Sequence, residues 1–227
     1  MDTQFLLLWL EGPLQAWGSD SRFGRRDTLK FPTKSGVLGL VCCALGASGE
    51  QKQLLQEFSS LSNTVVSYGS NPSEPVLRDF HMVGNGYDDS DPWSTLLIPK
   101  TSNGKKAVGG GTKMTYRFFL VDAKFAVALE VPSARVDSVV EALKNPTYDL
   151  YLGRKTCVPT EFIYRGVFRT EADALEQAAV LATEKSLVES FRVVDGEAEG
   201  EVMSLNDVPL QFGPAKKYRD RRVTIVS

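Results

Sequence analysis

Histidine and cysteine are scarce in this chain of 227 residues, which contains one histidine and three cysteines. The single histidine, His81, excludes a histidine-rich metal centre and any mechanism that needs two imidazoles. Cys42 and Cys43 are adjacent and Cys157 stands alone, so the chain has neither the CxxC pair typical of zinc sites nor the even cysteine count of a disulfide framework. We therefore expect neither a metal nor another cofactor, and we expect Cys42 and Cys43 to pack as small apolar side chains.

Long apolar runs are also lacking, and none approaches the roughly 18 residues that a membrane-spanning helix needs. The N-terminus has no basic stretch, and Glu11 ends the short apolar run that follows it, which is not typical of a signal peptide. These features predict a cytoplasmic protein without a membrane partner.

The net charge is only −2, but the charged residues are segregated along the chain. Residues 22–34, 100–117 and 216–222 each carry five basic residues and at most one acidic residue. Residues 171–201 carry nine acidic residues and two basic ones. A nearly neutral protein with this distribution can still present a basic face to a polyanion such as RNA.

Apolar periodicity predicts both strands and helices in this chain. Strands are expected at residues 5–10, 63–68, 78–83, 115–120, 125–131, 162–168, 187–194, 201–205 and 222–226. Helices are expected at residues 35–45, with Ser35 as the N-cap, and at 51–58, 133–143 and 172–181. The order of these elements predicts an α+β fold that contains a split β-α-β unit of ferredoxin-like type. Residues 69–114 are rich in glycine, proline and small polar residues, and the flanking strands are expected to bracket them as an extended hairpin.

Two N-terminal segments are candidates for RNA contact. In residues 12–18, two glycines bracket a turn in which Gln15 and Trp17 are not both expected in the core, so the amide can meet a base edge and the indole can stack on a base. The alternative is a tight turn with Trp17 buried. In residues 31–39, Thr33, Lys34, Ser35 and Gly36 surround a helix start that is suited to an anion, although the segment is not a Walker loop. The alternative there is an ordinary N-cap.

Two later segments combine aromatic rings with cations, which suits single-stranded nucleic acid. In residues 148–157 the candidates are Tyr151, Gly153, Arg154 and Lys155, and the alternative is a solvated turn. The basic stretch 216–222 contains one ring, Tyr218, and the alternative is a solvated or disordered chain end. His81, with a tyrosine and a lysine, is a candidate for acid–base cleavage of RNA, and the alternative is a structural histidine on a strand.

Four of these stretches occur together in one known family. Residues 12–18 (GPLQAWG), 31–40 (FPTKSGVLGL), 77–81 (LRDFH) and 151–157 (YLGRKTC) resemble, in order and spacing, the CasD subunits of type I-E CRISPR Cascade complexes. These subunits are members of the repeat-associated RNA-binding protein superfamily. The resemblance implies a ferredoxin-like (RRM-like) domain in residues 1–150, with a thumb hairpin inserted at about 70–118, and a small β-rich part in residues 151–227.

The resemblance also implies a function in antiviral defence. Such a protein caps the 5′ handle of the CRISPR RNA without cleaving it, contacts the backbone and large subunits, and meets target DNA only indirectly. No small-molecule substrate is implied. The residues expected to contact RNA are Gln15, Trp17, Arg22, Arg25, Thr33, Lys34, Ser35, Gly36, Lys105, Lys106, Lys113, Tyr151, Gly153, Arg154, Lys155, Tyr218 and Arg219.

Two other functions stay open at this point. One is a metal-independent endoribonuclease that processes precursor CRISPR RNA, as a relative in type I-C systems does. The other is a scaffold whose basic segments bind acidic protein partners.

Overall fold

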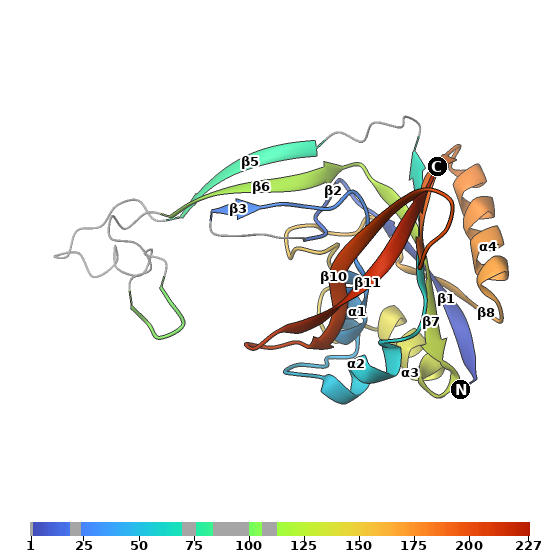
Figure 1. Cartoon of the computed structure of the whole chain (residues 1–227), viewed down its shortest axis with the longest axis horizontal. Helices are drawn as coiled ribbons and strands as arrows, with labels where there is room; N and C mark the ends of the chain where they lie inside the picture. Colours follow the sequence, from blue (N-terminus) through green and yellow to red (C-terminus); the bar gives the residue numbers. More distant parts are fainter. Residues whose placement is uncertain (1, 19–23, 70–75, 84–99, 106–112) are drawn as a thin grey trace.

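The computed structural model describes residues 2–18, 24–69, 76–83, 100–105 and 113–227. The fold is a mixed α/β arrangement with a seven-stranded antiparallel sheet and a second, four-stranded sheet (Figure 1). In the large sheet the strand order is β10-β11-β9-β4-β7-β1-β8. Its strands are β1 (Thr3–Glu11), β4 (Asn63–Gly69), β7 (Lys124–Pro132), β8 (Tyr164–Phe168), β9 (Val188–Asp195), β10 (Glu201–Gln211) and β11 (Lys217–Val226).

Both faces of the large sheet are covered by helices. Leu6, Leu8 and Leu10 of β1 pack with residues of α1 (Lys34–Ala44), α2 (Lys52–Phe58) and α3 (Ser133–Lys144). Leu7 and Trp9 pack on the opposite face against α4 (Glu171–Glu184). Because successive side chains of a strand point to opposite faces, a strand buried on both sides is apolar at nearly every position. This accounts for the uninterrupted apolar run in β1.

The second sheet carries an arm that extends away from the helices (Figure 1). The second sheet consists of β2 (Leu14–Gln15), β3 (Arg25–Arg26), β5 (Val76–Val83) and β6 (Lys113–Val121). The arm is the antiparallel pair of β5 and β6, which runs from Val76↔Leu120 to Val83↔Lys113. The pairing of the strands expected at 78–83 and 115–120 is therefore observed. Most of the stretch between them lies outside the described residues.

One local expectation and one of the alternatives need correction. The N-cap of α1 is Thr33 and not Ser35, since the Thr33 hydroxyl accepts a hydrogen bond from the Gly36 backbone N–H at 3.1 Å. The basic stretch 216–222 is not a solvated chain end, because β11 begins at Lys217 and pairs with β10. Its Arg221 side chain is held by Asp207 (2.7 Å from Nε to Oδ1) and also pairs with Asp195, and this anchors the strand.

The predicted division into parts 1–150 and 151–227 stays a prediction. Strands from both ranges pair in one sheet, because β8 is hydrogen-bonded to β1 and β9 to β4. Within the described ranges, no helix is both long enough and apolar enough to cross a membrane. The same described residues contain no group of three His, Cys, Asp or Glu side chains that could hold a metal ion.

Candidate nucleic-acid interface

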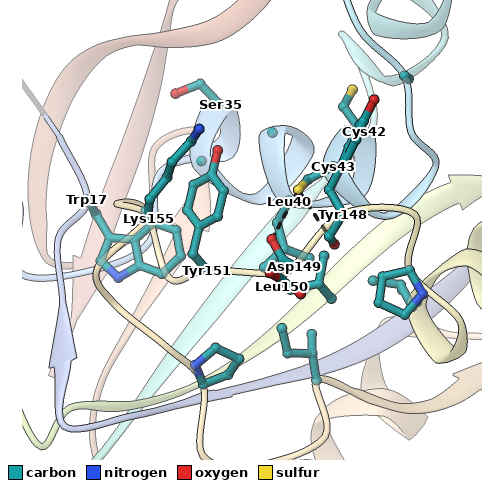
Figure 2. A pocket seen from close by; sticks show the side chains of 18 of the residues that line it. Trp17, Ser35, Leu40, Cys42, Cys43, Tyr148, Asp149, Leu150, Tyr151 and Lys155 are labelled. Atoms are coloured by element: carbon teal, nitrogen blue, oxygen red, sulfur yellow. Dashed lines mark hydrogen bonds between the residues drawn. The ribbon is translucent and has the colours of Figure 1, made fainter.

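A groove with a volume of about 1340 Å³ brings together segments that are far apart in the sequence. It runs along α1, and its other sides are formed by the loop between α3 and β8 and by the turn between β10 and β11. The loop leans on the C-terminal end of α1, where the Thr147 N–H donates to the Ala44 carbonyl at 2.9 Å and the Cys43 thiol faces the Asp149 carbonyl at 3.4 Å (Figure 2). Eight of the residues predicted to contact RNA line this groove: Trp17, Thr33, Ser35, Gly36, Tyr151, Gly153, Lys155 and Tyr218.

Gln15 and Trp17 are both in the core, so the expectation that only one of them is buried is wrong. The Gln15 amide nitrogen donates to the Leu10 carbonyl at 3.0 Å and to the Ala123 carbonyl at 2.7 Å. Its amide oxygen accepts a hydrogen bond from the Trp17 indole N–H at 3.0 Å. A polar side chain with every donor and acceptor occupied can be buried without penalty, which the residue pattern alone does not show. The Gln15 amide therefore lies below the groove and does not reach its surface.

Trp17 forms part of the groove wall because two glycines allow close approach. A Cβ atom at Gly36 would lie 2.7 Å from Cε3 of the Trp17 ring. Gly153 has φ +86°, and a Cβ atom there would lie 2.0 Å from the Ala16 carbonyl oxygen. The segments around Gly36 and Gly153 thus both pack closely against residues 16 and 17, and a side chain at either glycine would clash there.

The start of α1 is not an open anion site. The backbone N–H of Lys34 donates to the Asp207 carboxylate at 2.8 Å, and the N–H of Gly36 is capped by Thr33. Arg221 holds the same carboxylate with two hydrogen bonds, of 2.7 and 2.9 Å. An internal anion therefore occupies the position at which a phosphate was expected. The part of this segment that faces the groove is Ser35 together with Gly36.

The Lys34 side chain is also placed differently from the expectation. It is 2% exposed, and its ammonium group donates to the carbonyl oxygens of Ser59 and Leu61, just beyond α2. Burial lowers the pKa of this group. Lys34 therefore joins α1 to the end of α2 and does not line the groove.

Tyr151 and Lys155 form the polar wall opposite the start of α1. Figure 2 shows both side chains extending past Trp17 toward Ser35. Lys155 is exposed, while Tyr151 is half-buried, and burial raises the pKa of its phenol. Burial likewise raises the pKa of Tyr218 on the other side of the groove. Both phenols therefore stay protonated at neutral pH and can donate hydrogen bonds.

The Arg154 guanidinium makes its hydrogen bonds within the protein, whereas the side chain of its neighbour Lys155 is exposed. Its guanidinium donates to the carbonyl oxygens of Phe118 (3.2 Å), Arg26 (2.9 Å) and Asp27 (3.4 Å). It also lies 4.8 Å from the centre of the Phe119 ring. Arg154 thereby connects the groove loop to β3 and to the base of the β5–β6 arm, and the expectation of a guanidinium turned toward RNA does not match this position.

The remaining predicted residues that the structure describes do not line the groove. Arg25 is exposed beside Asp27 and above the Phe118 ring, and Arg219 donates to the Ser59 carbonyl at 3.0 Å. Lys105 and Lys113 belong to the arm region, and Arg22 and Lys106 lie outside the described residues. His81 pairs with Thr115 on the arm and does not line the groove.

Three exposed apolar residues on the groove were missed: Tyr148 (55% exposed), Val158 (61%) and Phe162 (86%). Tyr148 belongs to a segment that was singled out for its rings. Phe162 was assigned to a strand expected at 162–168, but β8 begins at Tyr164, so Phe162 is part of the preceding loop. Its aromatic character looked like a strand signal, and only the tertiary structure shows its exposure.

Comparison with known proteins relates the whole chain to one family. Residues 5–224 match the family model described as CRISPR-associated protein (Cas_Cas5). CRISPR system Cascade subunit CasD of Escherichia coli (strain K12) is 34% identical over 166 residues, which cover 71% of this chain and 70% of that protein.

Solved structures of similar fold agree with this. A chain of a CRISPR RNA-guided surveillance complex is 29% identical, with a TM-score of 0.73, and the match covers 98% of this chain and 89% of that one. A crystal structure of a Cas protein is 28% identical, with a TM-score of 0.55, and the match covers 97% and 92% of the two chains.

Proposed function

The chain belongs to the CRISPR-associated protein (Cas_Cas5) family, and on this premise we propose that it is a non-catalytic RNA-binding subunit of a CRISPR surveillance complex. In that role it holds the 5′ handle of the CRISPR RNA and contacts the backbone and large subunits of a Cascade assembly in the cytoplasm. Target DNA is met only through the assembled complex.

The observation that carries the proposal is the meeting of distant segments at one groove. Single-stranded RNA is recognised by rings that stack, by hydrogen bonds and by cations near phosphates. The groove supplies each of these: the exposed ring of Tyr148, the hydroxyl groups of Ser35, Tyr151 and Tyr218, and the exposed ammonium group of Lys155. Lys144 and Lys216, which also line it, add two further cations.

The arrangement of the sheet supports the RRM-like assignment. The order β8-β1-β7-β4 places the first and last strands of the unit side by side, with α1 and α2 following β1 in the chain and α3 following β7. This connectivity supports the assignment of a ferredoxin-like β-α-β-β-α-β unit. In the proposal the β5–β6 arm is the thumb, which carries Lys105 and Lys113 toward the guide and a neighbouring subunit.

A salt titration of RNA binding tests the phosphate contact. The probe is a labelled single-stranded RNA that corresponds to the 5′-terminal part of the CRISPR RNA. Lys155→Gln is expected to weaken binding and to reduce the slope of log K against log salt by about 0.7, the value for one phosphate contact on a single strand. Lys52→Gln is the matched control, since Lys52 is exposed on α2, is paired with Glu50 and does not line the groove.

A second RNA, a precursor repeat, tests the absence of catalysis. Incubated with the pure chain in EDTA, a precursor repeat RNA is expected to remain intact. A defined cut that His81→Ala abolishes would replace the proposed function with that of an endoribonuclease. Lack of any protection of the RNA 5′ end, with the chain alone and in its assembled complex, would instead support the protein scaffold.

A further inference from the structure

Phe162 is a large apolar side chain that stands in solvent at the edge of the groove. It is 86% exposed, and Val158, four residues earlier on the same loop, is 61% exposed. Burying a phenylalanine side chain stabilises a folded protein, and this chain by itself leaves the Phe162 ring in water. Exposed apolar side chains grouped at a concave site mark contact with another molecule.

The backbone around Phe162 is fixed, so its exposure is a built feature of the loop. On one side, the Thr160 N–H donates to the Glu11 carbonyl at 2.9 Å. On the other side, the Ile163 carbonyl accepts from the Trp9 N–H at 2.7 Å. Both contacts are to β1, at the centre of the fold. A loop backbone held in this way loses little conformational freedom when a partner packs on the ring.

Charges around Phe162 favour a polyanionic partner. The neighbouring carboxylate of Glu161 is paired with Arg165 at 2.8 Å and with Lys185 at 2.7 Å, which neutralises it. Lys144, Lys155 and Lys216 line the same groove, and among the described residues none of these three is ion-paired with a carboxylate. Asp149 is the other acidic side chain of the lining. The groove thus combines an apolar ring with an excess of positive charge.

We propose that Phe162 is the stacking platform for one unpaired base of the bound RNA, with Val158 and Tyr148 as the adjoining apolar surface. This inference rests on the proposed function and divides the groove into two ends. The phosphate backbone lies at the end that contains Ser35, Tyr151 and Lys155, and a base turned out of the strand covers Phe162. An apolar ring flanked by cations is the combination that single-stranded nucleic acid binds.

The test uses the full-length chain and the labelled single-stranded RNA described above, together with a set of RNAs in which each nucleotide in turn is made abasic. Phe162→Ala is expected to weaken binding of the intact RNA by about 5-fold to 150-fold, the range for loss of one base–aromatic stack. The slope of log K against log salt is expected to stay unchanged, because no phosphate contact is lost. Phe162→Trp retains the platform and is expected to bind about as tightly as the wild type.

The abasic RNAs locate the base. At one position the abasic change weakens binding to the wild type and has no further effect on Phe162→Ala, because both changes remove the same contact. Val188→Ala is the control, since Val188 is 67% exposed on β9, outside the groove, and it is expected to have no effect.

The outcomes separate the two proposals. If Lys155→Gln weakens binding while Phe162→Ala binds as the wild type does, the proposed function stands and the stacking platform is wrong. If Phe162→Ala weakens binding but keeps the same penalty for every abasic position, the platform is also wrong, since no base then depends on the ring. If the wild type binds no single-stranded RNA, alone or in its assembled complex, both proposals fail.

Discussion

The indole N–H of Trp17 donates a hydrogen bond of 3.0 Å to the amide oxygen of Gln15, and both side chains are buried. Gln15 in turn donates to the carbonyl oxygens of Leu10 and Ala123. This one amide therefore joins the end of β1, the turn between β6 and β7, and the wall of the groove. A segment that looked like an RNA-contacting loop is in large part a support for the groove.

Replacement of Gln15 by methionine is expected to destabilise the fold strongly. The substitution leaves two buried carbonyl groups and the Trp17 indole N–H without their partner, and each such group costs about 1–3 kcal/mol. Urea unfolding should show a loss of at least about 3 kcal/mol. Gln53→Met, at an exposed position of α2, should change the free energy of unfolding by less than about 0.5 kcal/mol. Equal effects of the two variants would contradict the proposed support role.

Gly153→Ala is expected to be far more destabilising than Gly104→Ala, although the two glycines have similar backbone angles. Their φ values are +86° and +80°. The unfavourable conformation alone costs an alanine about 1–2 kcal/mol at either site. At Gly153 the new Cβ atom would also lie 2.0 Å from the Ala16 carbonyl, whereas nothing lies within 4 Å at Gly104. Thermal or urea unfolding of both variants measures the difference, and similar losses would show that the loop moves freely away from residue 16.

Arg154→Lys is expected to loosen the connection between the groove loop and the β5–β6 arm. A lysine ammonium cannot reproduce the planar set of donors that reaches the carbonyls of Phe118, Arg26 and Asp27. The free energy of unfolding should fall by about 1–3 kcal/mol, and amide hydrogen exchange should become faster in β3 and at the base of β6. Arg169→Lys, at an exposed position, is the control. Unchanged exchange in β3 in the Arg154 variant would contradict this role.

The buried thiol of Cys42 is expected to make stability fall in alkaline solution. Burial, with a smaller contribution from Cys43, raises its pKa from 9.0 to about 11. Between these values the unfolded thiol has lost its proton while the folded one keeps it. Rising pH therefore favours unfolding in this window, by up to about 3 kcal/mol for a shift of this size.

Unfolding curves between pH 8 and 11 measure this effect as a difference between variants. Cys42→Ala should lose stability less steeply over this range than the wild type, whatever its stability at pH 8. Cys43→Ala is the matched comparison, since Cys43 is only half-buried, and its pH dependence should stay closer to that of the wild type. A Cys42→Ala variant with the same slope as the wild type would show that this thiol titrates alike in both states.

Much of the secondary structure was predictable from residue periodicity. The apolar run that became β1 and the helical spacing that became α3 both act locally, through backbone geometry and the burial of one face. The limits of β5 and β6 were also predicted to within a few residues, from the residue pattern of each strand. The start of β8 was misplaced by two residues, and this hid Phe162 in the strand.

The sequence by itself determined which segments matter: four short motifs with glycines, rings and cations in a fixed order. Only the tertiary structure decided which side chains of those motifs reach the groove. Lys34 and Arg154 donate hydrogen bonds to internal carbonyl groups, and Gln15 accepts one from Trp17. Ser35, Tyr151 and Lys155 line the groove instead. The chemical groups of a side chain determine what it can bind. Whether an internal partner already occupies it depends on tertiary contacts such as those of Gln15 with Ala123 and of Arg154 with Arg26, which join residues more than a hundred positions apart, and no local pattern records those.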